Sequence, residues 1–419
     1  MNGQSAIVLV IDRVGAGYLG PYGNTWVETP ELNRMASESL LIEHAISDSP
    51  LVDRIYRSYW FGTHALHDRA AASGEPSLPA ALGATPSTLL TDCSQLVSLE
   101  AGRDFGQRIL LATAHTPGRA VSTAADPAAG LGETQLGLAE TELGQSFAGM
   151  IEWVSRAAPP YLMWFHSRGM SGNWDAPFAM RDQYRDEEDP ETPAFVQPPD
   201  RLLGRDFDPD ELLGILHAYA GQVSLLDACL GALLDVLTDM RPQDQPLLIV
   251  TSPRGFALGE HGRIGACGDQ LRGEVLHVPL LIRLPGAQHA GQRLQMLSQP
   301  GDLYATLRHW FGNPLASPVD GSRSLIDAAA DLWGRECVCS VGCGQQSIRT
   351  PGWFLCEGEG GVSLYAKPDD RWEINEVSSR CPAIVDELSM LLQHFRTFVN
   401  SSGLAGMPAA SPICRNGMA

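Results

Sequence analysis

Three predicted strand ends carry the side chains that could do chemistry in this sequence. Asp12 ends the continuous apolar run AIVLVID, His166 lies near the end of YLMWFHS, and Arg254 follows PLLIVTS after Pro253. Ligands bind at the carboxyl ends of such buried strands in open α/β sheets. Asp12 could hold a metal ion, although an ion pair or a cap explains it more simply. His166 could act as an acid or base, or be a hydrogen-bonded structural histidine.

A fourth candidate is the start of a helix predicted over SDSPLVDRIYRSYWFG (47–62). Ser49 is a favourable N-cap, Pro50 suits the first helical position, and Tyr56 begins a helical apolar spacing. Free backbone N–H groups and the helix dipole favour an anion at such a start. Val52, close to this start, is apolar, so the segment offers a place for an anion without a reactive group at that residue.

Alternating strands and helices must position these residues. This alternation predicts an α/β fold with a large, mainly parallel sheet flanked by helices. Further apolar runs of the buried parallel type lie at 87–92 and 278–285, and helices are predicted at 31–45, 210–240 and 302–312.

After about residue 330 the pattern changes to short strand candidates separated by Gly and Pro turns, namely CVCSVG, SIRTPGWFLC, GVSLYAKPDD and RWEINEV. An amphipathic helix over 382–399 follows, so we expect a small antiparallel sheet plus one helix. The predicted divisions are 1–330, 331–402 and a loose tail over 403–419. The thiols of CVCSVGC could contribute to a metal site, but a buried strand explains their spacing at least as well.

Composition limits the classes of partner. The 419 residues are 44% apolar and 19% charged, which is typical of a globular protein. The formal net charge of −20 argues against nucleic acid and anionic membranes as partners. No segment approaches the uninterrupted apolar length of a membrane span. MNGQSAIVLVID lacks the basic region and cleavage site of a secretory signal, so we expect a cytoplasmic location and free thiols.

Several stretches resemble the sulfatase family of the alkaline phosphatase superfamily. IDRVGAGYLGPYGNTWVETPELNRMASES (11–39) is similar to the opening of the family. TSPRGFALGEHGRIG and LHVPLLIRLPG (within 251–286) are similar to its TSDHGxxLGEHGxxGK and RVPLIIxxPG segments, and VDGSRSLI (319–326) to DGRSLL. YLMWFHSRGMSGNWDAP and LYAKPDDRWEINEV further resemble a planctomycete subgroup of sulfatase-like proteins. The resemblance implies the sulfatase fold, including its small C-terminal sheet.

The resemblance also implies metal-dependent hydrolysis of sulfate esters. In the family, carboxylates from two strand ends hold a divalent cation, usually calcium, because a hard cation takes oxygen ligands. A cysteine or serine matured to formylglycine attacks sulfur from a helix start. Lysines and histidines stabilise the charge of the transferring group.

The metal-binding positions hold the wrong residues for that cation. Asp12 matches the first carboxylate of the family, but Arg13 stands at the second. Pro253 and Arg254 replace the second metal-binding pair. We therefore expect no calcium and no other cofactor, and we predict that one guanidinium fills the metal position and pairs with Asp12.

The catalytic positions are changed as well. The nucleophile position falls on Val52, and the arginine of the maturation motif falls on Tyr56. Ala266 replaces the lysine that follows GEHG. His166 and His261 match family histidines. No catalytic residue can therefore be assigned from the resemblance.

We interpret the sequence as a sulfatase-like pseudoenzyme that has lost hydrolysis and binds a small anionic ligand or a protein partner. One alternative is an active sulfuric ester or phosphoester hydrolase with an unconventional, metal-free site. Another is an ordinary sulfatase hidden by a slipped alignment, although no Cys-x-Pro-Ser-Arg motif occurs in the sequence.

Overall fold

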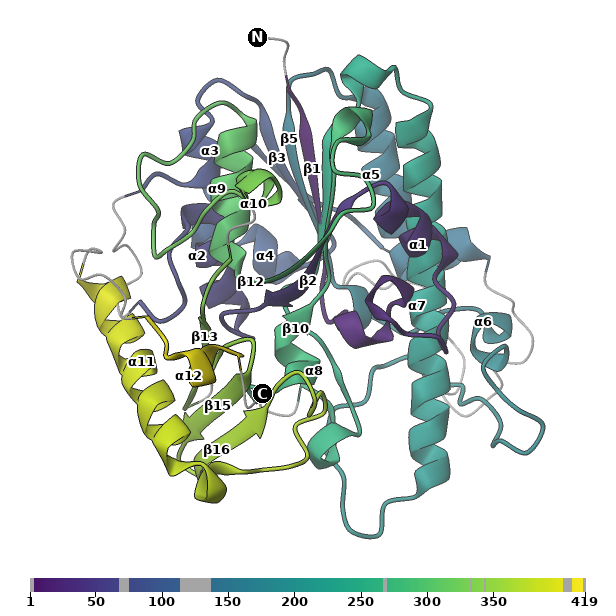
Figure 1. Cartoon of the computed structure of the whole chain (residues 1–419). Coiled ribbons are helices and arrows are strands. Elements are labelled where there is room, and N and C mark those ends of the chain that lie inside the picture. The colour runs from purple at the N-terminus through teal and green to yellow at the C-terminus, as the bar shows by residue number, and fades with distance from the viewer. Residues whose placement is uncertain are drawn as a thin grey trace.

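A large mixed sheet forms the centre of the protein, as Figure 1 shows for the computed structural model. The structure describes residues 4–67, 75–113, 137–266, 270–331, 334–342, 344–401 and 409–416. The strand order is β10-β2-β11-β7-β1-β5-β3-β4, with β12 beside β2. These strands are β1 (Ala6–Ile11), β2 (Leu40–Ile46), β3 (Ser87–Thr91), β4 (Gln107–Leu110), β5 (Leu162–Ser167), β7 (Leu247–Thr251), β10 (His277–Val278), β11 (Leu280–Arg283) and β12 (Arg293–Ser298).

The predicted α/β fold is confirmed, with most neighbouring strands parallel. β1 pairs in parallel with β5 and β7, and β3 pairs in parallel with β4 and β5. The expectation that 278–285 forms another parallel strand is wrong, because β11 runs antiparallel to β7 and β2. The chain leaves β7 and returns from the same end of the sheet without a crossover, which forces the antiparallel direction.

Helices cover both faces of this sheet (Figure 1). Alternate residues of β1 point to opposite faces, as a strand requires, and so belong to two different core clusters. One face carries α1 (Pro30–Ser37), α5 (Glu142–Arg156) and α7 (Pro209–Thr238). The other carries α2 (Val52–Phe61), α3 (Leu78–Ala81), α9 (Pro300–Trp310) and α10 (Leu325–Asp331). Shorter elements connect these layers, namely α4 (Ser94–Val97), α6 (Phe178–Asp182), α8 (Gly273–Leu276) and a small sheet of β6 (Arg201–Leu202), β9 (Arg263–Gly265) and β8 (Ala257–Leu258).

The helix expected over 31–45 ends early. α1 stops at Ser37, and β2 begins at Leu40. The apolar residues of LLIEHAI fit a helix or a strand by sequence alone. Pairing with β10, β11 and β12 decides for the strand, because it satisfies the backbone groups of β2 on both sides.

One helix in the described part of the chain, α7, is long and apolar enough to cross a membrane by length and composition. The sequence expectation concerned an uninterrupted apolar run, and α7 is interrupted by polar residues such as Gln222 and Asp227. Moreover, 72% of its most apolar window is buried inside the protein. α7 packs against α1, α5 and α6, so burial in the core accounts for its apolar surface.

The C-terminal part contains the expected small antiparallel sheet, ordered β13-β14-β15-β16 (Figure 1). Its strands are β13 (Val338–Gly342), β14 (Gln345–Arg349), β15 (Trp353–Gly358) and β16 (Gly361–Ala366), and α11 (Pro382–Asn400) covers one face. Cys339 lies buried in β13 as a free thiol and Cys337 precedes that strand, whereas Cys343 lies outside the described residues.

Two C-terminal expectations are corrected. RWEINEV (371–377) is not a strand, because the carboxylate of Asp370 accepts from the N–H groups of Ile374 (3.0 Å) and Asn375 (2.9 Å). The described part of the predicted loose tail, 409–416, packs against the small sheet through α12 (Pro412–Asn416). There, Trp353 Nε1 donates to the carbonyl of Ile413 at 2.9 Å.

Candidate functional site

The site is built around Asp12, which directly follows β1 at the carboxyl end of the strand. Its N–H donates to the carbonyl of Ser167 at 3.0 Å, and its own carbonyl accepts from the N–H of Met170 at 2.9 Å. The side chain is only 6% exposed. β1 and the end of β5 therefore fix a buried carboxylate at the edge where ligands bind in such sheets.

Arg254 occupies both oxygens of this carboxylate. Its Nε donates to Oδ1 at 2.9 Å and its Nη2 to Oδ2 at 3.0 Å, while its Nη1 donates to the carbonyl of Pro50 at 2.8 Å. Ser171 Oγ donates to Oδ2 at 2.7 Å. Burial acts to raise the pKa of Asp12, but Arg254 outweighs burial, and the pKa lies well below its ordinary value. The pairing of Asp12 with an arginine, predicted from the sequence, is confirmed.

Arg13 adds a second guanidinium beside the same carboxylate. The residue is buried and has a positive φ of 63°, a backbone conformation uncommon for arginine. Its Nη1 donates to the carbonyl of Gly255 at 3.3 Å, and its carbonyl accepts from the hydroxyl of Tyr219 at 3.2 Å. The charge of Arg13 also lowers the pKa of Asp12. Positive charge therefore surrounds the position of the first family carboxylate.

The helix start differs from the prediction in its first residues. α2 begins at Val52 with Leu51 as N-cap, not at Pro50 with Ser49 as N-cap. The reason is that Arg254 binds the carbonyl of Pro50, so the first carbonyl available to the helix is that of Leu51. Ser49 Oγ accepts from the N–H of Leu51 at 3.2 Å. Val52 is half-buried and offers only hydrocarbon at the nucleophile position.

Tyr56 and His166 form a buried pair behind the helix start. The Tyr56 hydroxyl and His166 Nδ1 lie 2.5 Å apart, and the two residues are 0% and 2% exposed. The rings of Trp60 and Trp164 surround Tyr56. Burial lowers the pKa of His166 and raises that of Tyr56, so both stay neutral near pH 7. This environment favours the structural interpretation of His166.

Of the remaining predicted residues, Pro253 directly precedes Arg254, whereas His261 and Ala266 belong to a later segment. The carbonyl of Pro253 accepts from Ser47 Oγ at 2.7 Å. His261 lies in a turn with a φ of 53°, and Ala266 follows β9. Within the described ranges, neither His261 nor Ala266 contacts the pair formed by Asp12 and Arg254. Ala266 has only a methyl group where the family lysine would supply charge.

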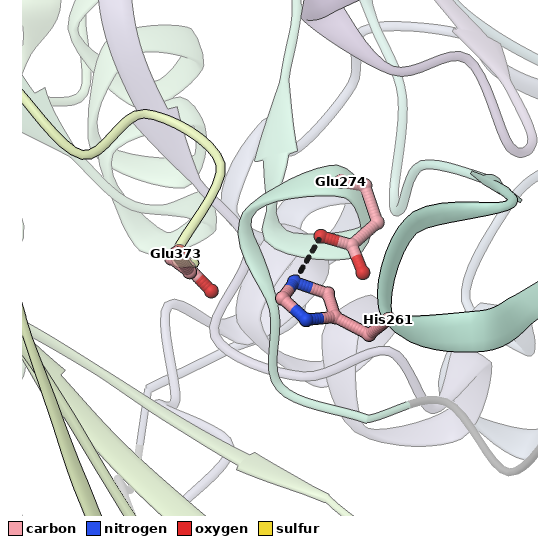
Figure 2. A group of neighbouring side chains, drawn as sticks. All are labelled: His261, Glu274 and Glu373. Carbon is pink, nitrogen blue, oxygen red and sulfur yellow. Dashed lines mark ion pairs between the residues drawn. The ribbon is translucent and has the colours of Figure 1, made fainter. Parts of the chain in front are cut away.

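His261 instead belongs to a cluster that sequence reasoning missed, shown in Figure 2. His261 Nε2 lies 3.8 Å from Glu274 Oε2, and one ligand atom from each of these residues and from Glu373 lies within 4.8 Å of the others. Glu373 also pairs with Lys367 Nζ (3.1 Å) and Arg272 Nη1 (3.7 Å). A cation here would compete with both, so we interpret Glu373 as the centre of an ion-pair network with Lys367 and Arg272, beside which His261 and Glu274 lie.

The donor set at Asp12 does not fit the calcium that the family resemblance implies. Calcium collects six to eight oxygens. Among the described residues at the matching positions, Asp12 supplies the carboxylate, and both of its oxygens already accept from Arg254. The matching positions Arg13 and Arg254 bring positive charge instead of ligands, so a divalent ion would meet repulsion.

Comparisons with known proteins agree with the fold. A family model described as Sulfatase matches residues 133–313. The multifunctional alkaline phosphatase superfamily protein PehA of Trinickia caryophylli is 32% identical over 129 residues, which are 30% of this chain and 24% of that protein. The N-acetylglucosamine-6-O-sulfatase of Bacteroides thetaiotaomicron is 30% identical over 107 residues, 26% of this chain and 19% of that protein. The matches thus span less than a quarter of either relative.

Among solved structures, the phosphonate monoester hydrolase of Agrobacterium radiobacter superposes with a TM-score of 0.75. The superposition covers 94% of this chain and 96% of that one, at 18% sequence identity. This likeness extends over both the large sheet and the small C-terminal sheet.

Proposed function

The chain belongs to the sulfatase family, and on that premise we propose that it is a non-catalytic member, which has lost metal-dependent hydrolysis of sulfate esters. One observation carries this proposal. Both oxygens of Asp12 accept hydrogen bonds from Arg254, at 2.9 and 3.0 Å. In this proposal the guanidinium takes the place of the divalent cation and neutralises the inherited carboxylate.

The hydroxyl groups near the helix start support the same proposal, because each has a structural partner. Ser47 Oγ donates to the carbonyls of Ser49 and Pro253. Ser58 Oγ donates to Asp48 and to the carbonyl of Thr63. All three serines are fully buried. Ser58 contacts the carboxylate of Asp48, but that carboxylate also accepts from the N–H of Ala65, and burial keeps the hydroxyl away from a substrate.

The alternative is an active hydrolase with an unconventional site. The relatives above are named as a sulfatase, a phosphonate monoester hydrolase and a multifunctional superfamily protein, so their names suggest ester substrates for a test. The short contact between Tyr56 and His166 favours this alternative. Its burial argues against it, because a substrate would have no access.

We propose that the remaining function is the binding of a small anionic ligand or a protein partner. The presence of two guanidinium groups, of Arg13 and Arg254, near the ligand-binding edge of the sheet supports an anion. The cytoplasmic location stays a prediction.

A turnover assay tests the loss of catalysis. The full chain is incubated with an aryl sulfate, an aryl phosphate and an aryl phosphonate monoester, with calcium or manganese added, and release of the phenol is followed. We expect rates equal to those of buffer, because Val52 offers no nucleophile and the carboxylate of Asp12 is already bound by Arg254 instead of a divalent cation. Turnover that rises in proportion to protein and falls in Tyr56→Phe, but not in the exposed control Glu187→Gln, would establish the alternative.

A further inference from the structure

A second site lies outside the pair formed by Asp12 and Arg254. A cavity of about 240 Å³ is enclosed between the loop after β1, the edge of the large sheet at β2 and β10, and the small C-terminal sheet. The residues that matter for its chemistry are Tyr18, His44, His277, Arg349, Arg371 and Trp372. The cavity therefore joins segments that are far apart in the sequence.

Arg349 is the unusual member of this wall. It ends β14 and is half-buried, and its Nε is fully buried with no hydrogen-bond partner. In the part of the chain that the structure describes, its guanidinium has no hydrogen bond or ion pair, and Glu373 acts on it only through longer-range attraction. Burial lowers the pKa of Arg349. A guanidinium in this position is costly unless an anion joins it.

The neighbouring histidines carry no charge that would balance or add to that of Arg349. Burial and the charge of Arg349 lower the pKa of His44 to about 4 and that of His277 to about 3, so both are neutral at pH 7. His277 Nε2 lies 2.7 Å from the carbonyl of Glu43, and His44 Nδ1 is buried without a hydrogen-bond partner. Two unsatisfied polar atoms, on His44 and Arg349, thus belong to residues of one cavity wall.

The acidic groups of the wall are already occupied. Glu43 pairs with Arg293 at 2.9 Å. Glu260 accepts from the hydroxyl of Tyr18 at 3.0 Å. Burial, together with nearby carboxylates, raises the pKa of Glu274 to about 8, so this group is mostly protonated at pH 7. The wall therefore does not neutralise Arg349.

The mouth of the cavity adds a second cation and an aromatic surface. Arg371 is exposed, and its guanidinium lies 5.1 Å from the ring centroid of Trp372, which is 51% exposed. The loop that carries them is held by Lys367, which pairs with Glu373 and donates to the carbonyl of Asp370 at 2.8 Å. These contacts preorganise the mouth.

We propose that this cavity binds the oxyanion group of a small ligand, a phosphate, sulfate or carboxylate, through Arg349 and Arg371, with Trp372 beside the rest of the ligand. Guanidinium groups suit oxyanions because their N–H groups match the acceptor geometry. The role of this ligand rests on the proposed function, whereas its binding is independent of whether the chain hydrolyses esters. A failure to bind anions in this cavity is therefore distinguishable from a failure of the proposed loss of hydrolysis.

Calorimetry on the full chain with inorganic phosphate, sulfate and acetate, at constant ionic strength, tests the proposal. We expect saturable binding of at least one anion, with its preference identifying the oxyanion. Arg349→Gln should weaken this binding about tenfold or more, and Arg371→Gln about threefold, because each removes a charge-assisted contact. Arg34→Gln, on the exposed side of α1, should leave it unchanged.

Tryptophan fluorescence locates the binding. The anion should change the emission of the wild-type chain, and Trp372→Phe should remove that change while leaving the calorimetric Kd within about threefold. Absence of saturable binding for all three anions, or an equal Kd in Arg349→Gln, would overturn the proposal. If Arg349→Gln fails to fold, an equal Kd in Arg371→Gln together with unchanged emission in wild type would overturn it.

Discussion

Replacing Asp12 with alanine is expected to lower the free energy of unfolding by about 3–5 kcal/mol. The substitution leaves Arg254 buried beside Arg13 without the carboxylate that now accepts two of its hydrogen bonds. The main cost is a buried guanidinium that has lost its carboxylate, rather than the loss of the contact itself. Urea denaturation followed by circular dichroism measures the change.

A double substitution separates these two causes. Because Asp12→Ala with Arg254→Met removes both charges, we expect it to cost less than Asp12→Ala alone. Glu187→Ala, in the exposed loop before α7, is the control and should change stability by less than about 0.5 kcal/mol. A loss in Asp12→Ala no larger than that of the control would contradict the ion pair.

Replacing Asp302 with alanine should have an effect of similar size, about 3–5 kcal/mol. Asp302 lies in the first turn of α9 and is fully buried, and its oxygens accept from Arg335 Nη2 at 2.6 Å and Nε at 3.1 Å. They also accept from the N–H groups of Gln299 (2.9 Å) and Arg323 (3.0 Å). Arg335 precedes β13, so this one carboxylate fastens the small sheet to the large domain.

The same denaturation experiment checks this prediction. Asp327→Ala removes a carboxylate whose side chain is 55% exposed, and it should lower stability by less than about 1 kcal/mol. Asp302→Asn should fall between the two, since an amide oxygen can keep part of the hydrogen bonding. Equal stability of Asp302→Ala and wild type would show that the small sheet does not depend on this contact.

The elements that sequence reasoning predicted correctly have strong local signals. The continuous apolar runs that became β1, β3, β5 and β7 read as buried strands without knowledge of their partners. Likewise, the long apolar pattern of α7 gave its bounds to within two residues. The family motifs then placed Asp12 and Arg254 at one site, and the structure brings these two residues together.

The errors arise where the outcome depends on a partner distant in the sequence. β2 reads equally as a helix until its neighbouring strands are known, and the start of α2 shifts because Arg254 binds the carbonyl of Pro50. Glu373 belonged to a predicted strand, and Arg349 is an ordinary strand residue by sequence. Only the packing of the small sheet against the large one places Arg349 in the wall of the cavity and Glu373 beside His261 and Glu274.

Calorimetric titration of calcium into EDTA-treated protein tests the replacement of the metal by Arg254 most directly. Asp12→Ala is the matched variant, studied at a temperature at which circular dichroism shows that it is folded. Glu274→Gln reports separately on the cluster of Figure 2. We predict no saturable binding to the wild-type chain at millimolar calcium, because Asp12 is the one inherited ligand and Arg254 occupies it. Tight, saturable binding that disappears in Asp12→Ala would contradict this account and favour an active metal-dependent hydrolase.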